Sequence, residues 1–165
     1  MQMDASFTVG DKVVYPTHGV ADVVALEDKK IGNMAMAFYH LHVVESGLKI
    51  IVPVAKAQEN GMRHVASQEA IDELFSLLRD HNVEHDRQTW NRRYRGFMEK
   101  IRTGSLFEVG QVFRDLSLLK NHKTLSHGER QMLNTARNLV IRELSTARKA
   151  PESEVAAELD SMFKN

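Results

Sequence analysis

The spacing of apolar residues changes near residue 65, and this change constrains the fold more than any other feature of the sequence. Between residues 7 and 65, short apolar runs alternate with turn signals such as Pro16–Gly19 and Glu45–Gly47, a pattern typical of strands joined by tight turns. From Ser67 onward, apolar residues recur at intervals of three and four, as in amphipathic helices. The sequence therefore predicts an α+β chain with two domains, 1–65 and 66–165.

The first domain is predicted to be a small, strongly bent sheet or barrel of four or five strands. A polar turn is expected over 27–33, between the second and third strands. Pro53 cannot donate a ladder hydrogen bond, so its strand is predicted to lie at an edge or to end there. His40 and His42 alternate with apolar neighbours and are expected to share the solvent or partner face. The expected strands are Lys12–Tyr15, Val20–Leu26, Met34–Val44 and Leu48–Val54.

The second domain is predicted to be a compact all-α domain of four to five helices. Each expected helix begins at a capping or helix-opening residue, and two of them show the Ser-x-x-Glu pattern of a capping box. The second helix is expected to turn Tyr94, Phe97, Met98 and Ile101 inward. The expected first residues or caps are Ser67, Thr89, Ser105, Ser126 and Pro151.

Composition and the absence of several motifs narrow the range of possible functions. The 165 residues include no cysteine, which excludes disulfides, thiolate metal sites and a cysteine nucleophile. The sequence shows no phosphate-cradling loop, nucleophile elbow, secretory signal or apolar run long enough to cross a bilayer. His81–His85 reads His-Asn-Val-Glu-His and matches a short zinc pattern, with His122 and His127 as conceivable further ligands; nothing in the spacing requires a metal, and this interpretation is the weakest. We therefore expect no enzyme activity, no cofactor and no metal.

The positive charge gathers around the single tryptophan. The formal net charge is zero, yet residues 86–102 hold six basic against two acidic residues. Trp90 extends the apolar stripe of its helix to the first turn, so it is either the end of a core stripe or a side chain that emerges from the bundle. No matching run of acids lies nearby in the sequence. An apolar wedge ringed by arginine is what minor-groove proteins use to enter a base step, and the residues alone leave both interpretations open.

Four blocks of sequence span nearly the whole chain. They are F-x-x-G-D-K-V-V-Y-P-x-x-G-V from Phe7, L-K-I-I-V-P from Leu48, T-W-N-R-R-Y-R-x-x-M-E-K-I-x-T-G from Thr89, and L-S-x-G-E-R-x-M-L-x-x-A-R from Leu125. In order and spacing these blocks resemble the CarD/CdnL family of bacterial transcription regulators.

The resemblance implies a role for each domain. Domain 1–65 would be a Tudor-like β barrel that docks on the β subunit of bacterial RNA polymerase. Domain 66–165 would lie on promoter DNA at the upstream edge of the −10 element, with Trp90 wedged into the minor groove of the opened promoter. Its phosphate contacts would come from Arg92, Arg93, Arg95 and Lys100. Polymerase contacts would come from Lys29, Ile31, His40, Ile51 and Pro53.

The same resemblance implies a cytoplasmic protein that reaches the nucleoid through RNA polymerase. We expect a monomer, because no predicted helix carries a second apolar stripe. One alternative function stays open. The chain would then be a Tudor-like adaptor that binds RNA polymerase without touching DNA, with Trp90 as a contact to another protein.

Overall fold

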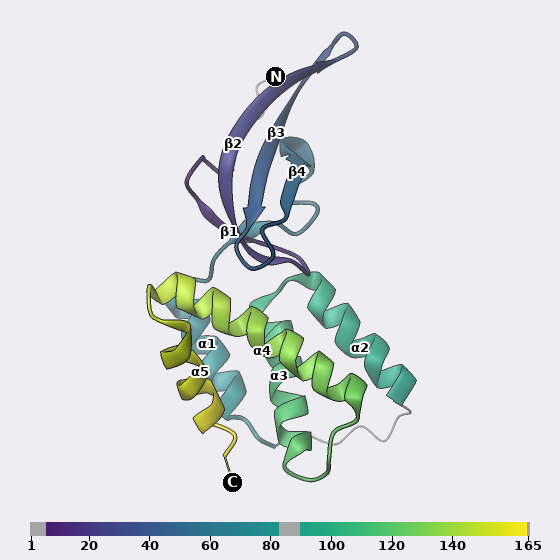
Figure 1. Cartoon of the computed structure of the whole chain (residues 1–165), viewed down its shortest axis with the longest axis vertical. Coiled ribbons are helices and arrows are strands. Elements are labelled where there is room, and N and C mark those ends of the chain that lie inside the picture. Colours follow the sequence, from purple (N-terminus) through teal and green to yellow (C-terminus); the bar gives the residue numbers. More distant parts are fainter. Residues whose placement is uncertain (1–5, 83–89, 165) are drawn as a thin grey trace. The chain divides into compact units, whose positions relative to one another are not determined.

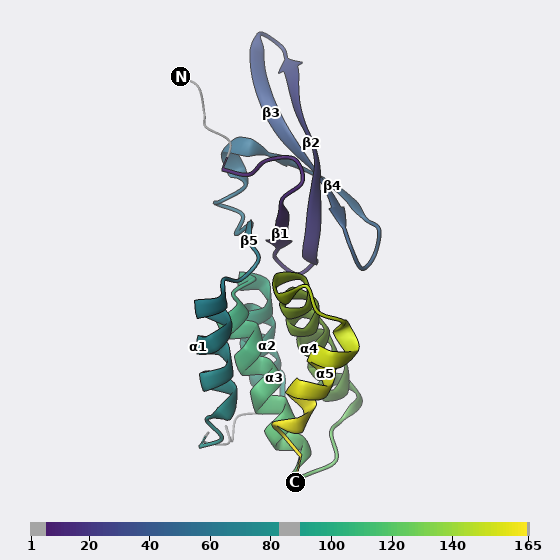
Figure 2. The same ribbon diagram turned by 90° about the vertical axis from the view of Figure 1, so that its left-hand side faces the viewer.

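The computed structural model of the chain describes residues 6–82 and 90–164, apart from the side chain of Trp90. It forms two compact units, residues 1–65 and 66–165, each with its own core. The first unit is a sheet and the second is a bundle of helices, and both can be followed in Figures 1 and 2. The predicted α+β class with an N-terminal sheet and a helical second part is confirmed.

Five antiparallel strands make up the first unit: β1 (Lys12–Tyr15), β2 (Gly19–Ile31), β3 (Met34–Val43), β4 (Lys49–Pro53) and β5 (Arg63–His64), with a short 3-10 turn at Val54–Lys56. Their order in the sheet is β4-β3-β2-β1-β5. A bulge at Val24 bends β2, where the register shifts between Val23 and Ala25. Within the described residues the two edge strands, β4 and β5, do not pair with each other, so hydrogen bonding does not close the sheet into a barrel.

The prediction of a polar turn over 27–33 is wrong. Residues 27–31 pair one by one with β3, from Glu27 opposite Phe38 to Ile31 opposite Met34, and form part of the long β2–β3 hairpin of Figure 1. The reversal is confined to Gly32 and Asn33, with Gly32 at φ +67°. Cross-strand pairing satisfies the backbone of both strands, and this outweighs the weak strand propensity of a polar segment.

The core of the sheet unit lies on one face. Tyr39, Leu41 and Val43 of β3 are buried there together with Val23 and Val52. The Tyr39 hydroxyl accepts a hydrogen bond from the backbone N–H of Phe7 at 3.1 Å, which ties the N-terminal segment to this face. Pro53 ends the edge strand β4, as the sequence predicts.

Five helices make up the second unit: α1 (Gln68–Arg79), α2 (Trp90–Thr103), α3 (Leu106–Lys120), α4 (His127–Arg148) and α5 (Glu152–Ser161). Ser67 and Ser105 cap α1 and α3, and Ser126 with Glu129 forms the complete capping box of α4. Thr89, the expected cap of α2, lies outside the described residues. α3 packs against α1, α2 and α4, and α5 covers part of α4 (Figure 2).

The expected inward stripe of α2 is shorter than predicted. Ile101 is buried and Phe97 and Met98 pack against the core, but Tyr94 is 42% exposed. Among the described side chains, the apolar stripe of α2 therefore begins at Phe97 rather than at Tyr94. Among the described residues, none of the helices is long and apolar enough to span a bilayer.

Candidate functional site

The residues predicted to contact a partner in the sheet unit share one face of the sheet. Side chains alternate along a strand, and paired residues point the same way. Lys29 pairs with Met36 and Ile31 with Met34; His40 pairs with Ile51, and Phe38 with Pro53. By register all of them oppose the buried face of Tyr39 and Leu41. We call this surface the outer sheet face: Lys29, Ile31, Met34, Met36, Phe38, His40, Ile51 and Pro53.

The outer sheet face is apolar and exposed near its middle and tip. Ile51 is 51% exposed and Ile31 57%. The Lys29 ammonium lies 6.0 Å from the centre of the Phe38 ring, at the limit of a cation–π contact. Isolated exposed apolar side chains are ordinary, whereas a contiguous group rimmed by polar residues marks an interaction surface.

His40 is not a free group on this face. Its Nε2 lies 2.6 Å from Glu27 Oε2, so the imidazole is oriented by a neighbouring strand. Glu27 was predicted to lie in a turn, so this contact was not expected, and neither were the contributions of Met36 and Phe38. Their alternation with Tyr39 and Leu41 was the available signal. His40 and His42 do share one face, as predicted.

In the helical unit, α2 begins at the single tryptophan. Arg92 and Arg95, two and five positions after Trp90, are exposed, and Lys100 is half-buried toward the C-terminal end of the helix. Glu99 is the acidic residue of this helix. The exposed face of α2 is therefore predominantly cationic, while the side chain of Trp90 lies outside the described residues.

Arg93 differs from its neighbours. Its side chain is 19% exposed, and its Nη2 lies 4.0 Å from Oε2 of the buried Glu129 on α4. The sequence indicated no acidic partner for these arginines, because Glu129 is 36 positions further along the chain. Although no run of acids lies nearby in the sequence, one of the three arginines faces a carboxylate inside the unit.

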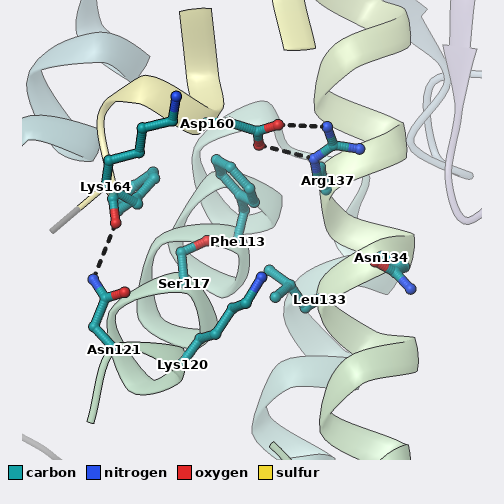
Figure 3. Close-up of a pocket in the computed structure, with 10 residues that line it drawn as sticks. Phe113, Ser117, Lys120, Asn121, Leu133, Asn134, Arg137, Asp160 and Lys164 are labelled. Carbon is teal, nitrogen blue, oxygen red and sulfur yellow. Dashed lines mark hydrogen bonds and ion pairs between the residues drawn. The ribbon is translucent and has the colours of Figure 1, made fainter. Parts of the chain in front are cut away.

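A groove between α3, α4 and α5, with a volume of about 610 Å³, is held together by its own polar groups (Figure 3). Arg137 donates two hydrogen bonds to Asp160, at 3.0 and 2.7 Å, and Asn121 Nδ2 donates to the Phe163 carbonyl at 3.1 Å. These pairs attach α5 to the bundle, so we assign the groove a structural role.

The short zinc pattern gains no support from the described part of the chain. Residues 83–85 lie outside it, and the His81 ring stacks on Phe163 with centroids 5.2 Å apart. No group of three histidine, cysteine or acidic side chains within metal-binding reach exists among the described residues.

The first unit thus has an exposed, mostly apolar sheet face and the second a cationic helix face. Comparison with known proteins defines the class. Residues 7–66 match the family model "CarD-like/TRCF RID domain" and residues 73–160 match "CarD, C-terminal domain". The chain is therefore a transcription regulator. It belongs to the CarD/CdnL family.

Two known proteins are similar to this chain. "Putative transcription factor YdeB" of Bacillus subtilis is 29% identical over 150 residues, covering 90% of this chain and 97% of that protein. A solved structure, "CdnLNt" from Myxococcus xanthus, is 35% identical and covers 41% of this chain and 96% of its own, with a TM-score of 0.33.

Proposed function

We propose that this protein docks on the β subunit of bacterial RNA polymerase through the sheet unit and stabilises the open promoter through the helical unit. In this proposal Trp90 wedges into the minor groove at the upstream edge of the −10 element. The observation that carries the proposal is the position of the tryptophan. It begins a cationic helix on which Tyr94, one turn later, is exposed.

The outer sheet face supports the docking step. Lys29, Ile31, His40, Ile51 and Pro53 come from three strands, and the register brings all five to one surface. β4 is an edge strand, so a strand of the partner has room to pair with it. Pairing through the backbone tolerates variation in side chains, which fits a face that is apolar rather than charged.

The cations of α2 support the DNA step. Arg92 and Arg95 are exposed on the helix that Trp90 opens, and Lys100 adds a third positive charge. Phosphate contacts of this kind position a protein on DNA without reading sequence. Arg93 would add a phosphate contact only through the part of its guanidinium that does not face Glu129.

The thermodynamic effect of such a wedge is a population shift. A contact made only with the opened promoter shifts the closed-to-open equilibrium by its differential affinity and by nothing else. A differential of about 1.4 kcal/mol changes that equilibrium tenfold. Docking on the polymerase raises the local concentration of α2 at the promoter, so the free protein needs little affinity for DNA.

The decisive measurement is the lifetime of open complexes on a ribosomal-type promoter with wild type, Trp90→Ala or no factor. We expect wild type to lengthen the lifetime and Trp90→Ala to lose this effect while still binding polymerase. If both proteins act alike, Trp90 does not contact the promoter and the adaptor function replaces the wedge.

The docking step is tested separately. Ile51→Glu places a charge on the outer sheet face and is expected to weaken binding to polymerase. Leu26→Glu is the matched control. Leu26 is also on a strand and 46% exposed, but it pairs with Tyr39 and so belongs to the opposite face. Equal binding by the two variants would remove the outer sheet face from the proposal.

The isolated protein provides a third test. We expect negligible binding to random duplex DNA at physiological salt, because the chain has no net charge and its positive charge is concentrated in residues 86–102. Tight binding that resists salt would contradict the tethered mechanism.

A further inference from the structure

α2 is attached to the bundle unevenly. Its C-terminal half packs through Phe97, Met98 and Ile101, whereas Tyr94 is exposed. Only one described side chain in the first turn and a half is largely covered, and it is Arg93. The contacts of Arg93 therefore help to orient the start of α2.

Arg93 meets an acid that is buried almost completely. Glu129 is 1% exposed, in the first turn of α4. Its Oε1 accepts hydrogen bonds from the backbone N–H of Ser126 at 2.9 Å and from the Lys123 ammonium at 3.0 Å. Its Oε2 accepts no hydrogen bond from any described residue and lies 4.0 Å from Nη2 of Arg93.

A capping box does not require this arrangement. The cap of α4 uses one carboxylate oxygen and the Ser126 hydroxyl, and such caps form on exposed helix ends. A buried carboxylate is costly unless cations or donors compensate it. Here the compensation comes from the loop before α4 through Lys123 and from α2 through Arg93. One carboxylate thus connects three segments of the unit.

We propose that Glu129 is a positioning residue: through Arg93, its carboxylate holds the first turns of α2, the helix that Trp90 begins. A side chain that is already held in its binding orientation loses less conformational entropy when it enters the groove. The functional part of this inference rests on the proposed role of Trp90, whereas the structural part concerns the free protein alone.

Glu129→Gln removes the charge and keeps an oxygen that can accept from Ser126. Because Trp90 is the only tryptophan, its fluorescence anisotropy decay reports local motion at the start of α2 directly. We expect faster local motion of Trp90 in the free variant and an open-complex lifetime at least threefold shorter than with wild type. Circular dichroism and the melting temperature establish that the variant is folded.

Asp160→Asn is the matched control, because it breaks the Arg137 ion pair of the same unit on α4 and α5 rather than at α2. It should leave Trp90 motion and the lifetime unchanged. If Glu129→Gln does not fold, Arg93→Gln tests the same contact from the other side. In the double variant the two effects should not add, since one interaction is lost.

The outcomes separate the two proposals. Unchanged Trp90 anisotropy in a folded Glu129→Gln or Arg93→Gln protein overturns the positioning role. Faster motion with an unchanged lifetime overturns the functional part, provided that Trp90→Ala shortens the lifetime. If Trp90→Ala itself has no effect on the lifetime, the wedge proposal fails, and the anisotropy still decides whether Glu129 orients α2.

Discussion

Replacing Gly110 in α3 with alanine is expected to destabilise the helical unit, because α1 approaches α3 at this glycine. A methyl group built on Gly110 would overlap Leu74 Cδ1, with Leu77 Cδ2 at 3.9 Å. Leu74 is fully buried, so its side chain has little room to rotate away. Overpacking of this kind costs about 1–3 kcal/mol, whereas alanine exceeds glycine in helix propensity by about 1 kcal/mol. We expect a net loss of about 1 kcal/mol.

The matched control is Gly96→Ala in α2. A methyl group at Gly96 would meet nothing within 4 Å, so the propensity gain of about 1 kcal/mol should appear undiminished. In a domain of this size, 1 kcal/mol corresponds to roughly 4–8 °C in melting temperature. Thermal and urea unfolding should therefore move in opposite directions for the two variants. If Gly110→Ala is as stable as Gly96→Ala, the close approach of α1 and α3 is not a real constraint.

Three further predictions concern stability and metal content. Tyr39→Phe leaves the buried N–H of Phe7 without its acceptor and should cost about 1–3 kcal/mol in urea unfolding of the sheet unit; an unchanged midpoint would contradict this. Burial raises the pKa of Glu129, but the backbone N–H of Ser126 and the Lys123 ammonium outweigh it, so the pKa lies below 4.5. The ionised Glu129 carboxylate therefore stabilises the folded state at pH values above about 4.5, and the stability of wild type relative to Glu129→Gln should fall as the pH drops below this value. A stability difference that does not change with pH would refute this prediction. Elemental analysis should find no stoichiometric zinc, and one equivalent per chain would revive the His81–His85 site.

Much of the fold was predictable because its signals are local. Alternating apolar residues and turn residues predicted β1, β3 and β4 nearly to the residue. Ser126 and Glu129 predicted the start of α4, since a capping box is a contact between residues three positions apart. The extension of β2 to Ile31 was missed, because nothing in its own polar sequence reveals that β3 pairs with it.

The candidate site was predicted only in part. The sequence singled out Trp90 and its arginines through charge density, and the resemblance to the family supplied their proposed roles. Neither source indicated that Arg93 turns inward or that Tyr94 lies outside the core. Glu27 and Phe38 were likewise missed beside His40. Each of these contacts joins residues whose separation in the sequence carries no regular spacing.

The sequence by itself determined the two-part organisation, the class of each part, the caps of α1, α3 and α4, and the family. These properties depend on interactions between residues a few positions apart or on motifs that can be read directly from the sequence. Only the tertiary structure decided which of the predicted residues share a surface and which of them contact a partner within their own unit. The outer sheet face exists because strand register aligns β2, β3 and β4. Glu129 meets Arg93 because α2 and α4 pack in the same bundle, and packing brings together charges that the sequence keeps 36 positions apart.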